Sequence, residues 1–441
     1  MSRLSRRRVL SLAGGGALAA KTGGIAAILA TGRAPAYAQT TTVHWLRWND
    51  YVPAADQTLR DMLPEAEKAL GFKINLERVN LNDLQPRITT GIQGGTGADI
   101  VMLFNNHPHL YAASVADLSD VAEEIGKAQG GYYPSAKSNC HGGGRWLGMP
   151  LGIVGVMIAY RKSWFDEIGV KTFPENWDQY REAGKKLKAK GRPIGQSLGQ
   201  SVGDPVIFTY PFLWSFGGKE VEEDGKTVAI NSKQTVEAIK YMAAFWKEAH
   251  DEGGLAWDDS NNNRAFLSGT ISASLNGASI YIEALRKPDQ YKTEAGTPMK
   301  DDILHAPHPR GPVGHFAMHV QQNHVVPTYS KNQKAAKELL KWFHTAANYD
   351  KWFRAGKGFY SGITTEWENN SMWQEDPVMA PYRVAGRLGQ VPGYPGPSGP
   401  KPAEALSKYV IVNMFGRACQ GKMTAEEAAA TAEKELKQIY G

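Results

Sequence analysis

Trp48, Asn49 and Asp50 combine an aromatic ring with an amide and a carboxylate directly after a predicted strand, 42–48. An indole ring packs well on the apolar C–H face of a sugar, and the two polar groups exchange hydrogen bonds with sugar hydroxyls. The same residues also have a structural interpretation, in which Trp48 closes the end of a core and Asp50 caps the next helix. The residues alone leave both interpretations open.

A second candidate loop contains Phe104, Asn105 and Asn106 at the end of the predicted strand 99–104. Two adjacent amides suit the recognition of hydroxyl groups, and they also suit a tight turn. Ligands of open α/β sheets bind outside the carboxyl ends of the strands. The position of this loop therefore makes it a candidate for binding, and the residues alone leave the turn interpretation open.

A rival chemistry is metal binding by five histidines within one Pro- and Gly-rich stretch: His305, His308, His315, His319 and His324. Imidazoles at this density bind Zn or Cu in other proteins. However, no HExxH spacing occurs, and no group of acidic residues accompanies the histidines. On a strand, His315 and His319 would lie ~13 Å apart, too far to share one ion. We therefore predict neither a metal nor a cofactor.

Sequence motifs of catalysis are absent as well. The chain has no GxSxG, no phosphate-binding Walker loop, no GxGxxG after a strand and no CxxC. We assign no catalytic residues and do not predict an enzyme. A glycosidase pair among the many carboxylates stays open, because nothing in the sequence singles out two of them.

The elements that would position these loops alternate between strands and helices. Strands are predicted at 42–48, 73–79 and 99–104, and helices at 54–70 and 81–93. This alternation predicts right-handed crossovers and a parallel sheet in an α/β fold. The stretch 148–160 is apolar on both faces and is predicted as one central strand. Later helices are predicted at 176–190, 232–250 and 332–347 and from Thr424 onward.

Two of these helices begin with recognisable capping residues. Asn176 is a good N-cap, with Gln179 at the capping-box position three residues later. Thr424 and Glu427 form the same pattern before the last helix. These pairs fix where both helices are expected to start.

The first 38 residues have the pattern of a removable export signal. Paired arginines at Arg6–Arg8 precede Val9 and Leu10, a weakly apolar run follows, and Ala36-Tyr37-Ala38 supplies small residues for cleavage after Ala38. This resembles a twin-arginine (Tat) signal peptide. We expect cleavage and a periplasmic product.

Removal of this segment changes the charge of the chain. Six of the 50 Lys and Arg lie within it, which leaves 44 against 44 Asp and Glu. A neutral product without a basic patch gives no reason to expect nucleic acid as a partner. About 400 residues favour two domains, and no remaining stretch reaches the ~20 apolar residues needed to span a membrane. Cys140 and Cys419 are either a disulfide or two separate thiols.

Five short motifs in order resemble one protein family. They are Gly97-Ala98-Asp99-Ile100-Val101, Gly148-Met149-Pro150-Leu151, Tyr160-Arg161-Lys162 with Phe165, Phe266-Leu267-Ser268-Gly269-Thr270 with Asn276-Gly277, and Ser330-Lys331-Asn332 with the helix to Phe343. Together they resemble the extracellular solute-binding proteins of ABC importers, family 1, the maltose-binding-protein-like type II periplasmic binding proteins. The resemblance covers nearly all of the chain after residue 38.

The resemblance implies a two-lobe α/β fold with hinge strands and a ligand cleft between the lobes. It places crossings near 152–156, 276–279 and 318–323. Lobe 1 would hold residues 39–152 and 278–319, and lobe 2 would hold 153–277 and 320–441.

The resemblance also implies a function. The protein would capture a carbohydrate or related polyhydroxylated solute as a monomer and deliver it to ABC permease transmembrane subunits with their cytoplasmic ATPase. The alternatives are a Tat-exported metal- or cofactor-dependent enzyme and a binding protein for a cationic or metal-chelate ligand. In the last case, Asp50 and Asp204 would be counter-ions.

Further ligand-binding residues follow from the resemblance alone. Asp204 and Tyr210 correspond to the family's aromatic wall in lobe 2, and Trp214 follows them as either wall or core. Asn276 and Tyr281 lie after the second expected crossing. All five join the two strand-end loops as candidate ligand contacts.

Overall fold

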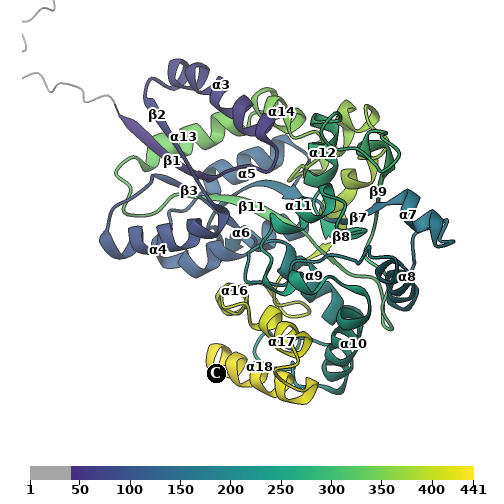
Figure 1. The fold of residues 1–441 in the computed structure, drawn as a ribbon. Coiled ribbons are helices and arrows are strands. Elements are labelled where there is room, and N and C mark those ends of the chain that lie inside the picture. The colour runs from purple at the N-terminus through teal and green to yellow at the C-terminus, as the bar shows by residue number, and fades with distance from the viewer. Residues whose placement is uncertain (1–40) are drawn as a thin grey trace, which may run out of the picture. The chain divides into compact units, whose positions relative to one another are not determined.

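The computed structural model describes residues 41–441. The export signal predicted for residues 1–38 lies outside the described residues and stays a prediction. Two main β-sheets organise the described chain, one with six strands and one with three. Helices surround both sheets (Figure 1).

The six-stranded sheet is mixed. Its strands, in spatial order, are β12 (Tyr360–Ser361), β6 (Met149–Val154), β11 (Val320–Val325), β3 (Ile100–Phe104), β1 (Thr42–Trp48) and β2 (Lys73–Val79). The pairs β1–β2 and β1–β3 are parallel, as the alternation of strands and helices predicts. Because β11 runs antiparallel to both β3 and β6, the fully parallel sheet expected from the sequence is not found.

Helices cover both faces of this sheet. On β1, Trp45 packs against Phe343, with ring centroids 5.7 Å apart. On β11, Gln321 accepts a hydrogen bond from Asn139 on the opposite face, because neighbouring residues of a strand point to opposite sides. The first face carries α3 (Pro53–Leu70), α5 (Ser119–Ala128), α13 (Gln333–His344) and α14 (Ala346–Ala355), and the second carries α4 (Leu84–Gly94) and α6 (Pro134–Cys140).

The three-stranded sheet has β7 (Met157–Arg161) at its centre, antiparallel to β8 (Ala273–Asn276) and β9 (Ile303–Ala306). All residues of the apolar helix α9 (Asp204–Ser215) are buried. It packs against α10 (Lys233–Ala249) and α17 (Val410–Cys419). The other helices in this part of the chain are α7 (Lys162–Glu167), α8 (Trp177–Ala189), α11 (Asn261–Leu267), α12 (Ser279–Arg286), α16 (Pro400–Ser407) and α18 (Ala425–Tyr440).

Short elements complete the fold. The strand pairs are β4 (His141–Gly142) with β5 (Arg145–Trp146) and β10 (Ala317–Met318) with β13 (Gly389–Gln390), and α15 is Ala385–Leu388. Segments of 3-10 helix are η1 (Leu81–Asp83), η2 (His107–Ser114), η3 (Glu252–Ala256), η4 (Met299–Asp302), η5 (Thr365–Asn369), η6 (Ser371–Gln374) and η7 (Ala380–Val384).

The predicted helix starts at Asn176 and Thr424 are confirmed. Asn176 accepts the Gln179 N–H at 2.9 Å, although the Gln179 side chain accepts the N–H of Glu175 rather than that of Asn176. Thr424 and Glu427 form the complete reciprocal capping box. Both helices therefore begin where local hydrogen bonding predicts.

The stretch 148–160, predicted as one strand, is two strands in different sheets. β6 ends at Val154 and β7 begins at Met157, so the chain passes from one sheet to the other at 155–156. Gly155 suits this passage, since an added Cβ would come 2.7 Å from the Tyr382 ring. An apolar pattern cannot show this break, because both halves are buried.

The strand pairing also differs from the expected division into lobes. Residues 303–306 lie in the three-stranded sheet, whereas 320–325 and 360–361 lie in the six-stranded sheet. The stretch 276–279 therefore does not lead into the other sheet, and the next passage falls at His319, between β10 and β11. Long-range pairing of β9 with β7 decides this, and short motifs contain no information about it.

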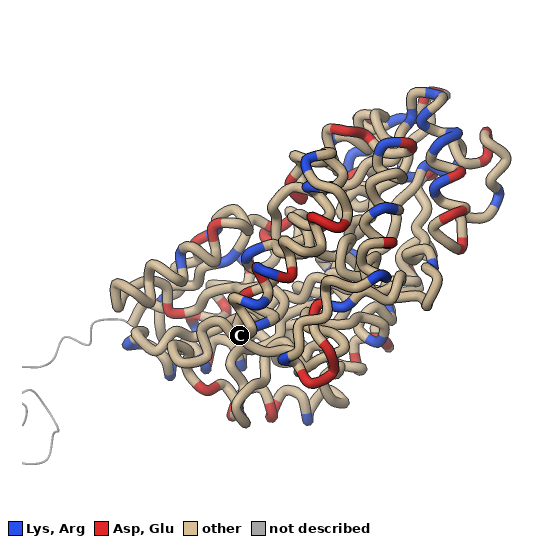
Figure 2. Tube along the Cα trace, turned by 90° about the horizontal axis from the view of Figure 1, so that it is seen from below, with Lys and Arg blue, Asp and Glu red and all other residues tan. Residues whose placement is uncertain are grey.

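Charge and hydropathy of the described residues are ordinary. Figure 2 shows Lys and Arg interleaved with Asp and Glu along residues 41–441, without a long stretch of one sign. None of the helices in this part of the chain combines the length and apolar character needed to cross a membrane.

Candidate ligand-binding site

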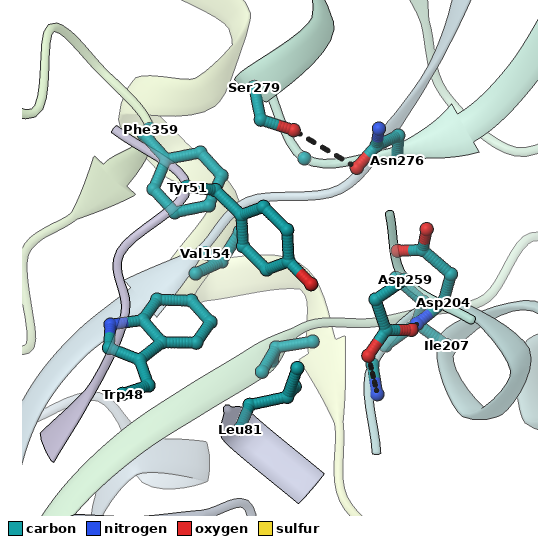
Figure 3. A pocket seen from close by; sticks show the side chains of 13 residues that line it. Trp48, Tyr51, Leu81, Val154, Asp204, Ile207, Asp259, Asn276, Ser279 and Phe359 are labelled. Atoms are coloured by element: carbon teal, nitrogen blue, oxygen red, sulfur yellow. Dashed lines mark hydrogen bonds between the residues drawn. The ribbon is translucent and has the colours of Figure 1, made fainter. Parts of the chain in front are cut away.

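A cavity lies where the two sheets approach each other, and residues from both sides line it (Figure 3). Its volume is about 30 Å³, room for about two water molecules at ~10–15 Å³ each. A sugar ring does not fit this space until the walls separate. The lining residues are Trp48, Tyr51, Leu81, Val154, Gly203, Asp204, Ile207, Asp259, Asn276, Gly277, Ser279, Val320 and Phe359.

One wall of the cavity is aromatic and belongs to the six-stranded side. Trp48 ends β1 and stacks on Phe359 with centroids 6.4 Å apart and planes at 26°. Tyr51 stands edge-on to Trp48 at 5.4 Å and 83°. In Figure 3 the Tyr51 ring reaches across the cavity with its hydroxyl toward the side that carries Asp204 and Asp259. These three rings form an apolar corner in which a ligand ring could stack.

The facing wall is polar and belongs to the three-stranded side. Asp204 opens α9, and its Oδ2 accepts from Asn262 Nδ2 at 2.6 Å. Asp259, just before α11, accepts the backbone N–H groups of Gly203 at 3.1 Å and Asp204 at 2.7 Å, and also the Ser201 hydroxyl. The two carboxylates are therefore neighbours held by backbone hydrogen bonds.

Amide and hydroxyl groups continue the polar wall. Asn276, the last residue of β8, donates to Asn263 Oδ1. Ser279, at the start of α12, donates to Asn276 Oδ1 at 3.5 Å and accepts from Asn263 Nδ2 at 2.9 Å. This triad gives the wall neutral groups of the type that bind ligand hydroxyls.

Burial sets the electrostatics of the cavity. It raises the pKa of both Asp204 and Asp259, and the neighbouring carboxylates raise each further. The pKa of Tyr51 is also raised, first by burial and then by the charge of Asp259. No Lys, Arg or His is among the described residues that line the cavity. The dry cavity therefore disfavours the negative form of both acids as long as no positive group enters it.

The structure brings together Trp48, Asp204 and Asn276 from the residues predicted as ligand contacts, because all three line the cavity. Asn49 is exposed beside it. Phe104 lies behind Trp48, with ring centroids 5.3 Å apart, and supports it. The end of β1 thus lies at the cavity, where the strand-end rule places candidate ligand contacts.

Asp50 has a structural role, which is one of the two interpretations that the sequence left open. It lies behind the cavity wall, where it accepts the Val52 N–H at 2.9 Å and a hydrogen bond from the Tyr360 hydroxyl. Burial raises the pKa of Asp50 to about 6. Its oxygens are thus engaged by the protein itself.

Asn105 and Asn106 are buried and do not line the cavity. Asn105 adopts a positive φ of 46°, and its Oδ1 accepts the Gln321 N–H at 3.0 Å. The Asn105 amide thus joins β3 to β11, which is the turn-and-packing role that the sequence kept as an alternative. The side-chain amide of Asn106 is buried without a hydrogen-bond partner among the described residues.

Three further predicted residues also lie outside the cavity lining. Tyr210 is fully buried in α9 and donates to Glu220 Oε2 at 3.1 Å. Trp214 packs in the core, 5.7 Å from Tyr210 between ring centroids. Tyr281 donates to Asp376 Oδ2 at 2.7 Å.

Sequence reasoning did not select Asp259, Phe359 or Tyr51 as ligand contacts, although all three line the cavity. Asp259 precedes a helix and is indistinguishable from an ordinary helix-start residue. Phe359 reaches the cavity only because β12 pairs with β6. The rule that ligands bind at strand ends could have identified Tyr51, since it stands three residues after β1.

The five histidines of the Pro- and Gly-rich stretch do not share one point, although His305, His308 and His315 line a common pocket. His308 contacts the carbonyl of Ile207, His319 Nδ1 accepts from Val156 N–H, and His324 Nε2 accepts from Trp45 Nε1–H. No group of three His, Cys, Asp or Glu in residues 41–441 is arranged to hold a metal ion. Cys140 and Cys419, whose pairing the sequence left open, are separate free thiols.

Comparison with known proteins gives a family match over most of the chain. The model of the family described as "Bacterial extracellular solute-binding protein" matches residues 49–350. A putative binding protein of Brucella abortus is 26% identical over 193 residues, which is 43% of this chain and 45% of that protein. The match thus spans less than half the length of this relative.

Solved structures share the fold. A maltose-bound protein of T. maritima is 21% identical with a TM-score of 0.75, covering 90% of this chain and 100% of that one. A tagatose-bound solute-binding protein of Thermotoga lettingae is 18% identical, also with a TM-score of 0.75, covering 91% and 100%. A laminaribiose-bound sugar transporter protein of Arthrobacter chlorophenolicus is 16% identical, with a TM-score of 0.75, covering 90% and 99%. The described chain has the two-lobe α/β fold of periplasmic binding proteins.

Proposed function

The chain belongs to the bacterial extracellular solute-binding protein family, and from this premise we propose that it captures a carbohydrate or related polyhydroxylated solute. The solute would enter between the two walls and be delivered to ABC permease transmembrane subunits with their cytoplasmic ATPase. The protein would act in the periplasm as a monomer, after cleavage near Ala38, and would perform no chemistry on the solute.

One observation supports this proposal most strongly: the aromatic wall and the polar wall come from different sheets and face each other across one cavity. Trp48, Tyr51 and Phe359 offer ring faces for stacking, while Asn276 and Ser279 offer hydrogen bonds to hydroxyls. Sugars present both an apolar C–H face and a rim of hydroxyl groups. The cavity correspondingly has an aromatic wall for the C–H face and a polar wall for the hydroxyl groups.

The small volume of the cavity supports a closing mechanism. We propose lobes of 42–154 with 320–361 and of 157–318 with 389–441, joined at 155–156, at His319 and within 362–388. A bridge between them is visible where Asn82 Nδ2 donates to Ser201 Oγ at 3.3 Å. A ligand that contacts both walls favours the closed arrangement by its differential affinity for it.

The test is a thermal-shift screen of protein purified from the periplasm against sugars, polyols, polyamines, amino acids and divalent metals. A solute that binds only the folded state stabilises it by about 2.7 kcal/mol at a hundredfold excess over Kd. We expect a selective shift with one class of polyhydroxylated solute, together with a smaller radius of gyration in X-ray scattering. Stabilisation by divalent metals alone would contradict the proposal.

A further inference from the structure

The candidate site holds two acids without a basic partner. Asp204 and Asp259 are each 5% exposed, and both line the cavity. A third carboxylate, Asp258, lies near both and raises the pKa of each through its negative charge. The nearby Arg264 donates to Ser260 Oγ and does not line the cavity. The described residues therefore leave the pair uncompensated.

One oxygen of this pair is free to meet a ligand. Asp204 Oδ2 accepts from Asn262, whereas Asp204 Oδ1 has no hydrogen-bond partner among residues 41–441. The hydroxyl of Tyr51 likewise has no partner in the described chain, and it points toward the acidic side in Figure 3. An unpartnered carboxylate oxygen in a side chain this deeply buried is costly unless something else satisfies it.

A neutral hydroxyl satisfies the hydrogen bond but not the charge. Burial of two neighbouring carboxylates raises the pKa of both, and this shift measures how strongly the dry cavity opposes their negative charge. A cationic donor supplies the hydrogen bond and the opposite charge together. Charge-assisted hydrogen bonds are roughly twice as strong as neutral ones.

The aromatic corner is also suited to a cation. Trp48, Tyr51 and Phe359 bring three rings to the side of the cavity opposite the acids. Ring faces attract an ammonium group, most strongly where water is excluded. The cavity therefore presents carboxylates on one side and π-faces on the other.

We propose that the solute of this site carries a protonated amino group, held between Asp204, Asp259 and the aromatic corner. The ligand class is an amino sugar or an aminated polyol, because Asn276 and Ser279, although bonded to each other and to Asn263, each keep a further hydrogen-bonding position for a hydroxyl. This inference rests on the proposed capture of a polyhydroxylated solute and narrows its chemistry.

The test is isothermal titration of protein purified from the periplasm with matched sugars. Glucosamine, galactosamine and mannosamine are each compared with two neutral partners, namely the parent hexose, which has a hydroxyl of similar size in place of the amine, and the N-acetylated form, which loses the charge but is larger. At least one amino sugar is expected to bind ~10-fold or more tightly than both neutral partners, a difference of about 1.4 kcal/mol.

Variants assign the effect to the acids. Asp204→Asn keeps an acceptor for Asn262 and removes one charge, so the preference for the amino sugar is expected to fall to about threefold or less. Asp224→Asn is the matched control, since Asp224 lies in an exposed turn with Thr227 and does not line the cavity. Circular dichroism and the thermal midpoint of Asp204→Asn establish that it is folded.

The outcomes separate this inference from the broader proposal. Equal affinity for neutral and amino sugars would contradict the inference that the solute carries an amino group, while it would still support carbohydrate capture. Binding of simple amines such as putrescine, without any sugar, supports the cationic site and contradicts carbohydrate capture. An amino-sugar preference that survives unchanged in folded Asp204→Asn overturns the role of the acid pair, and binding of no sugar or amine overturns both ideas.

Discussion

The backbone N–H of Asp204 donates to Oδ1 of Asp259 over 2.7 Å. Asp259 thereby caps the start of α9 from a distance, because Gly203, the residue at the N-cap position, has no side chain to do so. The same carboxylate lines the candidate site. The acid that orders α9 is thus part of the cavity wall.

This double role predicts that Asp259→Ala destabilises the fold. The substitution leaves the N–H groups of Gly203 and Asp204 and the hydroxyl of Ser201 without their acceptor. A loss of about 1–3 kcal/mol in the free energy of unfolding is expected. Urea denaturation measures it, with Asp224→Ala as a control for the loss of an exposed turn aspartate. A stability equal to wild type would show that water replaces the cap.

Tyr51→Phe is expected to weaken ligand binding without changing stability. The hydroxyl makes no hydrogen bond within the described chain, whereas the ring packs against Trp48. Phe keeps the ring and removes only the group directed at the acidic wall. Affinity for the solute found in the screen should fall about 3–10-fold, the equivalent of one ordinary hydrogen bond. A lower thermal midpoint without ligand would instead give the hydroxyl a structural role.

Glu220 predicts a pH dependence of stability. Its carboxylate accepts from Tyr210 and Tyr440, and burial raises its pKa from 4.5 to about 7. Between these two values the folded state keeps a proton that the unfolded state has released, so stability falls as pH rises from about 4.5 to about 7.

The matching experiment is urea denaturation of wild type and Glu220→Gln at pH 5 and pH 8. Gln stays neutral, and a tyrosine hydroxyl accepts a hydrogen bond as readily as it donates one. The decline in stability between the two pH values is expected to be smaller in the variant by about 2–3 kcal/mol. Identical slopes in the two proteins would place the pH dependence elsewhere.

Local patterns predicted the parts of the fold that depend on local chemistry. The start of the last helix at Thr424 follows from its reciprocal hydrogen bonds with Glu427, and Gly71 ends α3 in the left-handed conformation that glycine favours. The strand-end rule for ligands in α/β sheets also pointed to Trp48, which lines the candidate cavity.

The remainder depends on long-range pairing and on helix orientation. Residues 303–306 join the three-stranded sheet only through their pairing with β7. Tyr210 lies in a helix that is apolar on every side and fully buried, so no periodicity shows which face points to a ligand. The resemblance suggested Tyr210 for the site, whereas its hydroxyl meets Glu220 in the core.

Cys140 is predicted to be chemically inert in the folded protein. It is fully buried, it donates to Asn323 Oδ1 at 2.9 Å, and burial raises the pKa of its thiol. Since the thiolate is the reactive form, iodoacetamide should modify it only at the rate of unfolding. Cys419→Ser isolates Cys140 for mass spectrometry, and rapid labelling under native conditions would contradict its burial.

Asn82 tests the closing mechanism apart from the ligand contacts. Its side-chain amide meets the Ser201 hydroxyl through two contacts of 3.3 Å, one from Nδ2 and one to Oδ1, and Asn82 does not line the cavity. Asn82→Ala removes a contact that exists only when the walls are near each other, so the unliganded variant should be more open, with a larger radius of gyration. A ligand that binds the closed state must then shift more of the protein into it. The affinity for the solute is therefore expected to fall about 3–10-fold, with little change in the radius of gyration of the liganded protein. The control is Gln57→Ala, which removes an amide side chain from the exposed face of α3. Asn80→Ala would not serve, since the Asn80 side chain accepts from the backbone N–H of Asn82 itself. A variant with wild-type radius and affinity would show that this bridge does not contribute to closure.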